Sequence, residues 1–285
     1  SGYDAITVSR KTDQYKFVVK EFLEKHNVTF DPSIDTIQVI NFFNAINGEW
    51  LLKLIRQDSQ FPREKLSLLS GIKTALAFLY SPSIIWIPVS LEEILRVSGN
   101  AGLAMDEGLF STKNLGGIGS FSDDLLFIGL ENCEDQLLMH FYPVELKIGG
   151  LGIVKKGKEQ GQKTADLLKE HLNKEGFLGE FYKNFFAKVA LTNAEKMSLF
   201  HVWDNQKWSI VYEDYREDLL NNNFKISYNL NKAIGDFGLV YFGNDTIKRT
   251  LDTSEGLMKI DLLEIDGYDF LVKSVDESID LFHNS

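Results

Sequence analysis

The stretch "DDLLFIGLENCEDQLLMHFYPVELKIGG", residues 123–150, decides the expected fold. Its run "LLFIGL" is continuously apolar, which is typical of a strand buried on both faces, and the following "NCEDQ" is polar and typical of a turn. A second apolar run then ends in Glu145-Leu146-Lys147. Because successive side chains of a strand point to opposite faces, Glu145 and Lys147 share one face and Leu146 lies on the other. The stretch therefore predicts a hairpin that carries charged groups within an apolar segment.

Folding this hairpin about Glu134 predicts which residues lie opposite one another. Position 123 is then opposite 145 and position 124 opposite 144, so Asp123 and Asp124 lie beside the Glu-Leu-Lys triplet. A slip of one residue in the register decides whether Asp123 or Asp124 faces Glu145, and the sequence leaves this choice open. Either register brings two carboxylates and one lysine together at strand ends.

Such a group of side chains suits metal-assisted chemistry on phosphate. Carboxylate oxygens are hard ligands that suit Mg²⁺. A bound Mg²⁺ can polarise a phosphodiester and lower the pKa of a bound water, while a lysine ammonium can position that water or offset charge on the phosphate. The alternative is a structural ion pair between Glu145 and Lys147 at the sheet edge, with the two aspartates only beginning a strand.

The rest of the chain mixes helical and strand-like patterns, so we predict an α/β protein. The expected helices cover 13–26, 35–58 with an interruption near Asn47-Gly48, 63–80, 158–174 and 177–190. Ser90 and Glu93 form a capping-box pattern that begins another short helix, and residues 98–123, rich in Gly and Ser, predict a long loop.

The pattern changes near residue 195. Short strand-like runs follow, namely "SLFHVWD", "KWSIVYED", "FKISYNL" and "GLVYFG". We therefore predict a part over 1–195, in which helices precede an α/β core at about 90–195, and a separate β-rich module over 196–285.

Composition narrows the class of protein. The 285 residues are 44% hydrophobic, enough for a sizeable core, and no apolar run reaches the roughly 18 residues that would cross a bilayer. The single cysteine, Cys133, permits no internal disulfide, so we expect the reducing cytoplasm. The chain begins Ser-Gly without Met, which is typical of a scar left by tag cleavage and predicts a fragment of a longer protein.

The charge is distributed unevenly. A net charge of −11 argues against a nucleic-acid partner, because phosphate is neutralised by Lys and Arg. From Lys147 to Lys188, however, nine lysines stand against five acids, whereas from Asp204 to the end sixteen acids stand against eight bases. The basic strip suits a DNA backbone, and an ordinary solvated surface is the alternative.

The Asp and Glu-Leu-Lys residues resemble the signature of the PD-(D/E)XK nuclease superfamily, an Asp at the start of one strand and Glu-X-Lys on the next. Asp124, directly before "LLFIG", and Glu145-Leu146-Lys147 match that layout. The resemblance covers about 90–175 and implies a restriction-endonuclease-like mixed sheet flanked by helices, followed here by the β-rich C-terminal module. It also implies a metal-dependent DNA nuclease.

The resemblance implies roles for single residues. Mg²⁺ or Mn²⁺ would be held by Asp124, Glu145 and the backbone carbonyl of Leu146. Lys147 would help to position the attacking water.

The resemblance also implies two further groups. The family often places a Gln on the next helix, for which Gln160 and Gln162 are candidates, and we favour Gln160. An acid from an upstream helix would be Glu49, Glu92 or Glu93.

A narrower likeness concerns "SLEEILRVSGNAGL", "SDDLLFIGL" and "VELKIG". These stretches resemble the nuclease-like portion of bacterial defence proteins that join such a domain to a HerA/FtsK-type ATPase, as in phosphorothioation-dependent DNA restriction. The likeness implies DNA and an ATPase or translocase as partners. The alternative function is a catalytically inactive nuclease-like module for DNA binding or assembly, which the acidic last third favours.

A rival motif lies nearby. Residues 152–159, "GIVKKGKE", nearly fit the phosphate-binding pattern G-x-x-x-x-G-K-[ST], but Glu159 stands where a hydroxyl is required. We therefore interpret Lys155, Lys156 and Lys158 as a mobile basic loop that contacts a DNA backbone.

Overall fold

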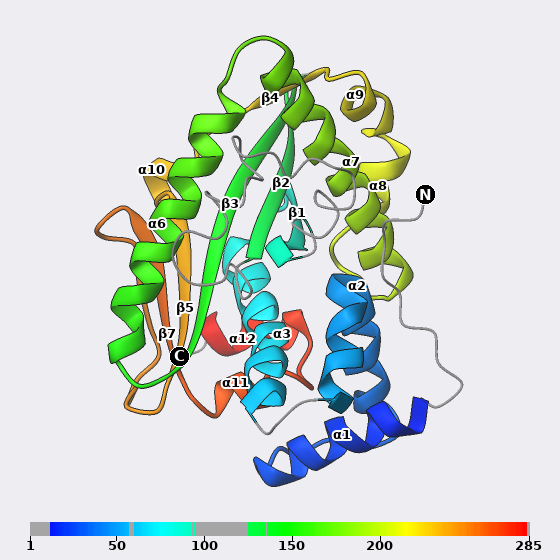
Figure 1. Ribbon diagram of the computed structural model, residues 1–285, viewed down its shortest axis with the longest axis vertical. Helices are drawn as coiled ribbons and strands as arrows, with labels where there is room; N and C mark the ends of the chain where they lie inside the picture. Colours follow the sequence, from blue (N-terminus) through cyan, green and yellow to red (C-terminus); the bar gives the residue numbers. More distant parts are fainter. Residues whose placement is uncertain (1–11, 57–59, 93, 95–124, 135, 284–285) are drawn as a thin grey trace.

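The computed structural model describes residues 12–56, 60–92, 94, 125–134 and 136–283. These residues form one seven-stranded mixed sheet flanked by helices (Figure 1). The strand order is β1-β2-β3-β5-β7-β6, and β4 also pairs with β3. The strands are β1 (Ile84–Ser90), β2 (Leu125–Cys133), β3 (Gln136–Gly149), β4 (Phe224–Ile226), β5 (Phe237–Gly243), β6 (Thr250–Asp252) and β7 (Leu257–Leu263).

The first two thirds contain all five predicted helices, but the fourth begins six residues earlier than predicted and the fifth ends nine residues later. They are α1 (Thr12–Lys25), α2 (Asp35–Arg56), α3 (Gln60–Leu79), α6 (Gly152–Leu172) and α7 (Phe177–Leu199). The predicted interruption of α2 is confirmed, because Asn47 has φ −160° and ψ 101° inside the helix. The side chain of Asn47 accepts a hydrogen bond from the backbone N–H of Glu49 at 3.0 Å, as the cap of a new helical segment does. No helix among the described residues is long and apolar enough to cross a lipid bilayer.

The predicted hairpin is confirmed, and its register is shifted by one residue. Cys133 pairs with Gln136 and Leu125 with Val144, so position 125, and not 124, lies opposite 144. The difference arises because two residues, and not Glu134 alone, separate the paired strands. Asp123 and Asp124 lie outside the described residues, and so does the whole of the predicted 98–123 loop.

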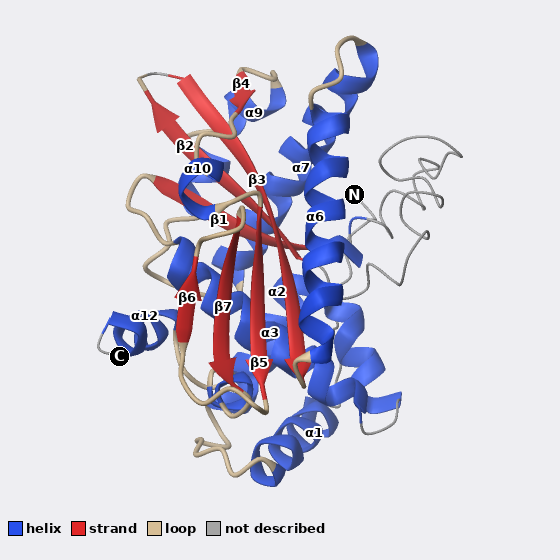
Figure 2. Cartoon of the chain, turned by 90° about the vertical axis from the view of Figure 1, so that its left-hand side faces the viewer, coloured by secondary structure: helices blue, strands red, loops and turns tan. Residues whose placement is uncertain are grey.

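The two faces of β3 are covered by different helices. A Cβ on Gly71 of α3 would overlap the side chain of Leu146, and a Cβ on Gly157 of α6 would lie 3.2 Å from Cγ of Lys147. Helix α3 therefore packs on the face that carries Leu146, and α6 on the face that carries Lys147. Figure 2 shows α6 running along one side of the sheet, next to β3. This confirms the predicted alternation of side chains.

The strands of residues 196–285 do not form a separate sheet, so the prediction of a separate β-rich module is wrong in this respect. Strand β5 pairs in parallel with β3, and β7 with β5, so these strands extend the sheet that begins before residue 196. Three short helices precede β5, namely α8 (Ser209–Glu213), α9 (Arg216–Leu220) and α10 (Asn231–Ile234), and two follow β7, namely α11 (Asp266–Asp269) and α12 (Val275–His283). The run "KWSIVYED" contains α8 and no strand, because its buried Trp208 and Val211 recur at helical spacing.

Candidate functional site

The candidate site lies where β3 extends beyond its neighbour β2. The described pairing of β2 with β3 ends at Leu125 and Val144. From Val144 to Gly149, β3 pairs with β5 on its other side. Glu145, Leu146 and Lys147 thus lie on a stretch of β3 with one described strand neighbour.

Glu145 and Lys147 form a buried ion pair on the face covered by α6. The Oε2 atom of Glu145 lies 2.7 Å from Nζ of Lys147, and only 2% of the Glu145 side chain and 14% of the Lys147 side chain are exposed. The pair satisfies the distance of an ion pair but lacks hydrogen-bond geometry, and within the described residues neither oxygen of Glu145 has a hydrogen-bond partner. The Lys147 ammonium offsets part of the cost of burying this carboxylate, and a further ligand for its oxygens would offset the rest.

Helix α6 reaches this pair because glycines face the sheet. A Cβ on Gly157 would lie 2.9 Å from Cδ1 of Leu239 as well as close to Lys147, and a Cβ on Gly161 would overlap the ring of Phe237. The stem of Lys147 is therefore held between the sheet and the first turns of α6. Its position is set by packing, which is what a precisely placed ammonium requires.

The structure separates the two glutamine candidates. Gln162 is exposed, and its Nε2 donates a hydrogen bond to Oδ1 of Asp166 at 3.0 Å. Gln160 is partly buried, and its Oε1 is buried without a hydrogen-bond partner in the described part of the chain. Gln160 also lies one helical turn from Lys156 on the same side of α6. This geometry favours Gln160.

The three lysines occupy a helix and not a loop, so the predicted basic loop is wrong. All of them lie in the first two turns of α6. Lys158 forms an ion pair with Glu255 at 2.6 Å, on the flank of α6 that faces the start of β7. Lys155 and Lys156 are exposed, and Lys156 lies on the flank toward α3. The predicted basic strip therefore divides between two sides of the helix.

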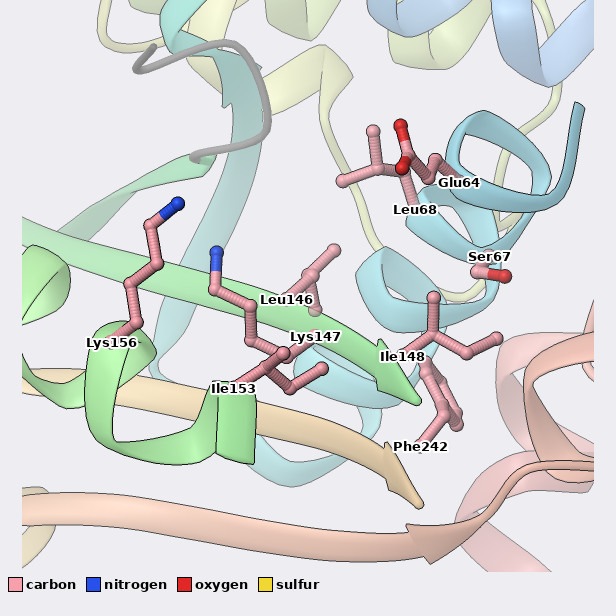
Figure 3. Close-up of a pocket in the computed structure, with 9 residues that line it drawn as sticks. All are labelled: Glu64, Ser67, Leu68, Leu146, Lys147, Ile148, Ile153, Lys156 and Phe242. Carbon is pink, nitrogen blue, oxygen red and sulfur yellow. The ribbon is translucent and has the colours of Figure 1, made fainter. Parts of the chain in front are cut away.

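A cavity of about 220 Å³ adjoins the end of β3, between α3 and α6 (Figure 3). Figure 3 shows the ammonium groups of Lys147 and Lys156 pointing the same way, with the carboxylate of Glu64 on the α3 side. The lining residues are Glu64, Ser67, Leu68, Leu146, Lys147, Ile148, Ile153, Lys156 and Phe242. A floor of apolar side chains under charged groups of both signs suits a ligand that carries charge.

Glu64 is a site residue that the sequence analysis missed. It shares one face of α3 with Leu68 and Gly71, the face that meets Leu146, and this helical spacing was the available signal. Of the acids that were considered, Glu92 accepts a hydrogen bond from Nε1 of Trp50 at 2.8 Å.

The other acids that were considered lie outside the cavity lining. Glu49 is partly buried in α2 and does not line the cavity beside β3. Glu93 lies outside the described residues.

The donor atoms of the site fit a hard divalent cation. The described residues include no group of three or more His, Cys, Asp or Glu side chains that could hold a metal by themselves. Glu145, however, offers two buried carboxylate oxygens that accept no hydrogen bond from the described part of the chain, and such oxygens are the ligands that Mg²⁺ and Mn²⁺ prefer. The other implied carboxylate, Asp124, lies outside the described residues, so a metal site here requires atoms from that part of the chain.

His140 belongs to the pairing of β2 with β3 and does not line the cavity. Its Nε2 is 3.1 Å from Oε2 of Glu131, on the neighbouring strand β2. Burial lowers the pKa of His140 below its usual 6.5, an effect that the hydrogen bond to Glu131 partly offsets. His140 is therefore a structural residue whose charge responds to pH.

No protein-family model, no curated protein and no solved structure matches the chain. The function must therefore be inferred from the site itself.

Proposed function

We propose that the protein is a metal-dependent DNA nuclease that hydrolyses phosphodiester bonds, with a restriction-endonuclease-like fold. The observation that carries the proposal is Glu145, a carboxylate with 2% of its side chain exposed and the Lys147 ammonium 2.7 Å away. Neither of its oxygens accepts a hydrogen bond from the described residues. Buried polar groups without partners are rare and call for an explanation, such as a catalytic role or an ion that completes the site. A divalent cation at the edge of β3 supplies that explanation.

The roles of the residues follow from their chemistry. Asp124, Glu145 and the carbonyl of Leu146 would hold Mg²⁺ or Mn²⁺, which when bound polarises the phosphodiester and lowers the pKa of a water. Lys147 places a positive charge beside Glu145, where it can orient the attacking water and stabilise negative charge on phosphate. Gln160, with its unpartnered Oε1, can accept a hydrogen bond from that water.

The cavity wall extends this assignment. Glu64 offers a further carboxylate from α3, in the place where Glu49, Glu92 or Glu93 was expected. Lys156 offers a cation for the backbone phosphate next to the reacting one, because it lines the cavity and has no acidic partner within the described residues. Lys158 contributes less, because Glu255 already neutralises it.

Cleavage of plasmid and linear DNA with Mg²⁺ or Mn²⁺ tests the proposal. Glu145→Gln and Lys147→Met should abolish cleavage, and EDTA should do the same, while the control Lys158→Met should cleave normally. Cleavage that survives EDTA or Glu145→Gln would contradict the assignment. Calorimetric titration with Mn²⁺ tests the site without turnover, since wild type should bind the ion and Glu145→Gln should not.

The wider context is part of the same proposal. The likeness to defence proteins supports a place within a larger prokaryotic restriction or anti-phage protein, in which an ATPase or translocase domain or subunit delivers DNA. The strongly acidic residues after Asp204 favour a second candidate, an inactive nuclease-like module that binds DNA or a basic partner protein. Partner binding that needs no metal, together with no Mn²⁺ bound by wild type, would favour this second function.

A further inference from the structure

The start of α6 is fastened to the end of β5 by a tyrosine and an aspartate. The Tyr241 hydroxyl lies 2.7 Å from the carbonyl oxygen of Gly149 and 2.7 Å from Oδ1 of Asp245, so its one proton is donated to either acceptor. Asp245 also accepts a hydrogen bond from the N–H of Leu151 through Oδ2 at 3.2 Å, and Asn244 donates its N–H to the Gly149 carbonyl at 3.2 Å. The turn that joins β3 to α6 is thus held on both of its sides.

The first turns of α3 are fastened to the chain just after β7. Arg63 donates from Nε to the Tyr268 hydroxyl at 3.1 Å and from Nη2 to Oε1 of Glu264 at 2.7 Å. The Tyr268 hydroxyl in turn donates to the same Glu264 oxygen at 2.6 Å. About two helical turns further along α3, the Ser70 hydroxyl donates to the carbonyl of Gly267 at 2.8 Å.

Both contacts come from one segment and lie next to the cavity. The segment runs from Tyr241 at the end of β5 to Tyr268 in α11. Its first contact, at Leu151, lies two residues before the cavity-lining Ile153 and five before Lys156. Its second contact, at Arg63, immediately precedes the cavity-lining Glu64. Hydrogen bonds therefore tie both walls of the cavity, α6 and α3, to the same segment of the chain.

We propose that Tyr241 and Tyr268 are positioning residues that set the separation of α6 and α3, and with it the placement of Lys156 and Glu64. Neither tyrosine lines the cavity, so each acts through the helix it fastens. The consequence for DNA rests on the proposed function, whereas the fastening of the two helices does not. The last third of the chain thereby completes the site, although it contributes only Phe242 to the cavity lining.

The test uses Tyr241→Phe and Tyr268→Phe, which keep each ring and remove only the hydroxyl. The control is Tyr228→Phe, because that hydroxyl contacts Oδ1 of Asn173 at 3.4 Å, just beyond the opposite end of α6. Tyr241→Phe should speed hydrogen exchange of the amides of Lys155–Lys158 by about 3- to 10-fold, the range expected for one lost hydrogen bond. Tyr268→Phe should do the same early in α3, and the control should change neither helix.

DNA affinity at two salt concentrations supplies the second readout. Tyr241→Phe should weaken DNA binding by a similar factor in wild type but have no further effect in a Lys156→Ala background, because residues that act through one another are not additive. Unchanged exchange in both Tyr→Phe variants would overturn the positioning role. Additive losses would overturn the claim that Tyr241 acts through Lys156. If hydrogen exchange is faster in the Tyr→Phe variants while Lys156→Ala leaves DNA affinity unchanged, that result supports the positioning role of the tyrosines and contradicts the proposed DNA path.

Discussion

Removing the Lys147 ammonium while Glu145 remains should strongly destabilise the fold. At the observed separation of 2.7 Å, two unit charges attract each other by about 6 kcal/mol for an effective dielectric constant of about 20. This attraction offsets the unfavourable burial of a carboxylate that accepts no hydrogen bond from any described residue. Lys147→Met keeps most of the side-chain stem and deletes the charge, so the free energy of unfolding should fall by roughly 3–5 kcal/mol, as for other broken buried pairs.

Replacing both partners should have the opposite outcome. In the double variant Glu145→Leu with Lys147→Met, no buried charge remains, and the apolar replacements have similar volume. Its free energy of unfolding should equal that of wild type or exceed it by about 1–4 kcal/mol. Lys158→Met is the matched control, because 36% of that lysine side chain and 66% of its partner Glu255 are exposed, and such pairs contribute only about 0–1 kcal/mol.

Urea unfolding at neutral pH, followed by tryptophan fluorescence, measures all of these free energies, and constant m-values confirm comparable unfolding transitions. The reasoning is refuted if Lys147→Met is as mild as Lys158→Met, because the ammonium would then not compensate a buried charge. It is refuted equally if the double variant is as unstable as Lys147→Met. Glu145 would in that case contribute to stability by itself, and its retention would need no functional explanation.

Three further measurements probe the fold and the site. Gly161→Ala should lower the free energy of unfolding by about 1–3 kcal/mol, because the new Cβ would overlap a buried ring. Gly152→Ala is the control, because Gly152 has open space around it, and it should be neutral or stabilising by up to about 1 kcal/mol. Equal urea midpoints of the two variants would contradict the packing of α6. Because burial lowers the pKa of His140, the unfolded chain binds more protons below about pH 6.5, so stability should fall from pH 7 to 5 and fall less in His140→Gln. Lys156→Ala should reduce the slope of log DNA affinity against log salt concentration by about 1, and Lys158→Ala should reduce it by much less. The reverse order would place the DNA on the other flank of α6.

The sequence predicts the parts of this fold that depend on local periodicity. The alternation along β3 correctly assigns Glu145 and Lys147 to one face and Leu146 to the other, because the period of a strand leaves no freedom once the strand is identified. The helical spacing of apolar residues likewise predicts α1, α2 and α3 to within a few residues at either end. The interruption at Asn47 is predictable because Asn and Gly both favour the end of a helix.

Long-range pairing is what the sequence does not determine. The apolar runs of β5 and β7 are compatible with a sheet of their own or with extension of an existing one, and only the pairing of β5 with β3 decides between them. The hairpin register depends on a turn one residue longer than expected. Glu64 belongs to the site only because Gly71 lets α3 approach β3, and no local pattern states which strand that helix meets.

The end of β3 can carry buried charges because one of its faces makes an apolar contact and the other carries the charged pair. Leu146 anchors the strand in the apolar contact with α3, while the neighbouring Glu145 and Lys147 face α6. Since parallel pairing with β5 holds the backbone on one side, the unfavourable burial of Glu145 does not displace the strand. Glu145 is therefore held in place by the strand and by α6, although neither of its oxygens accepts a hydrogen bond from the described residues.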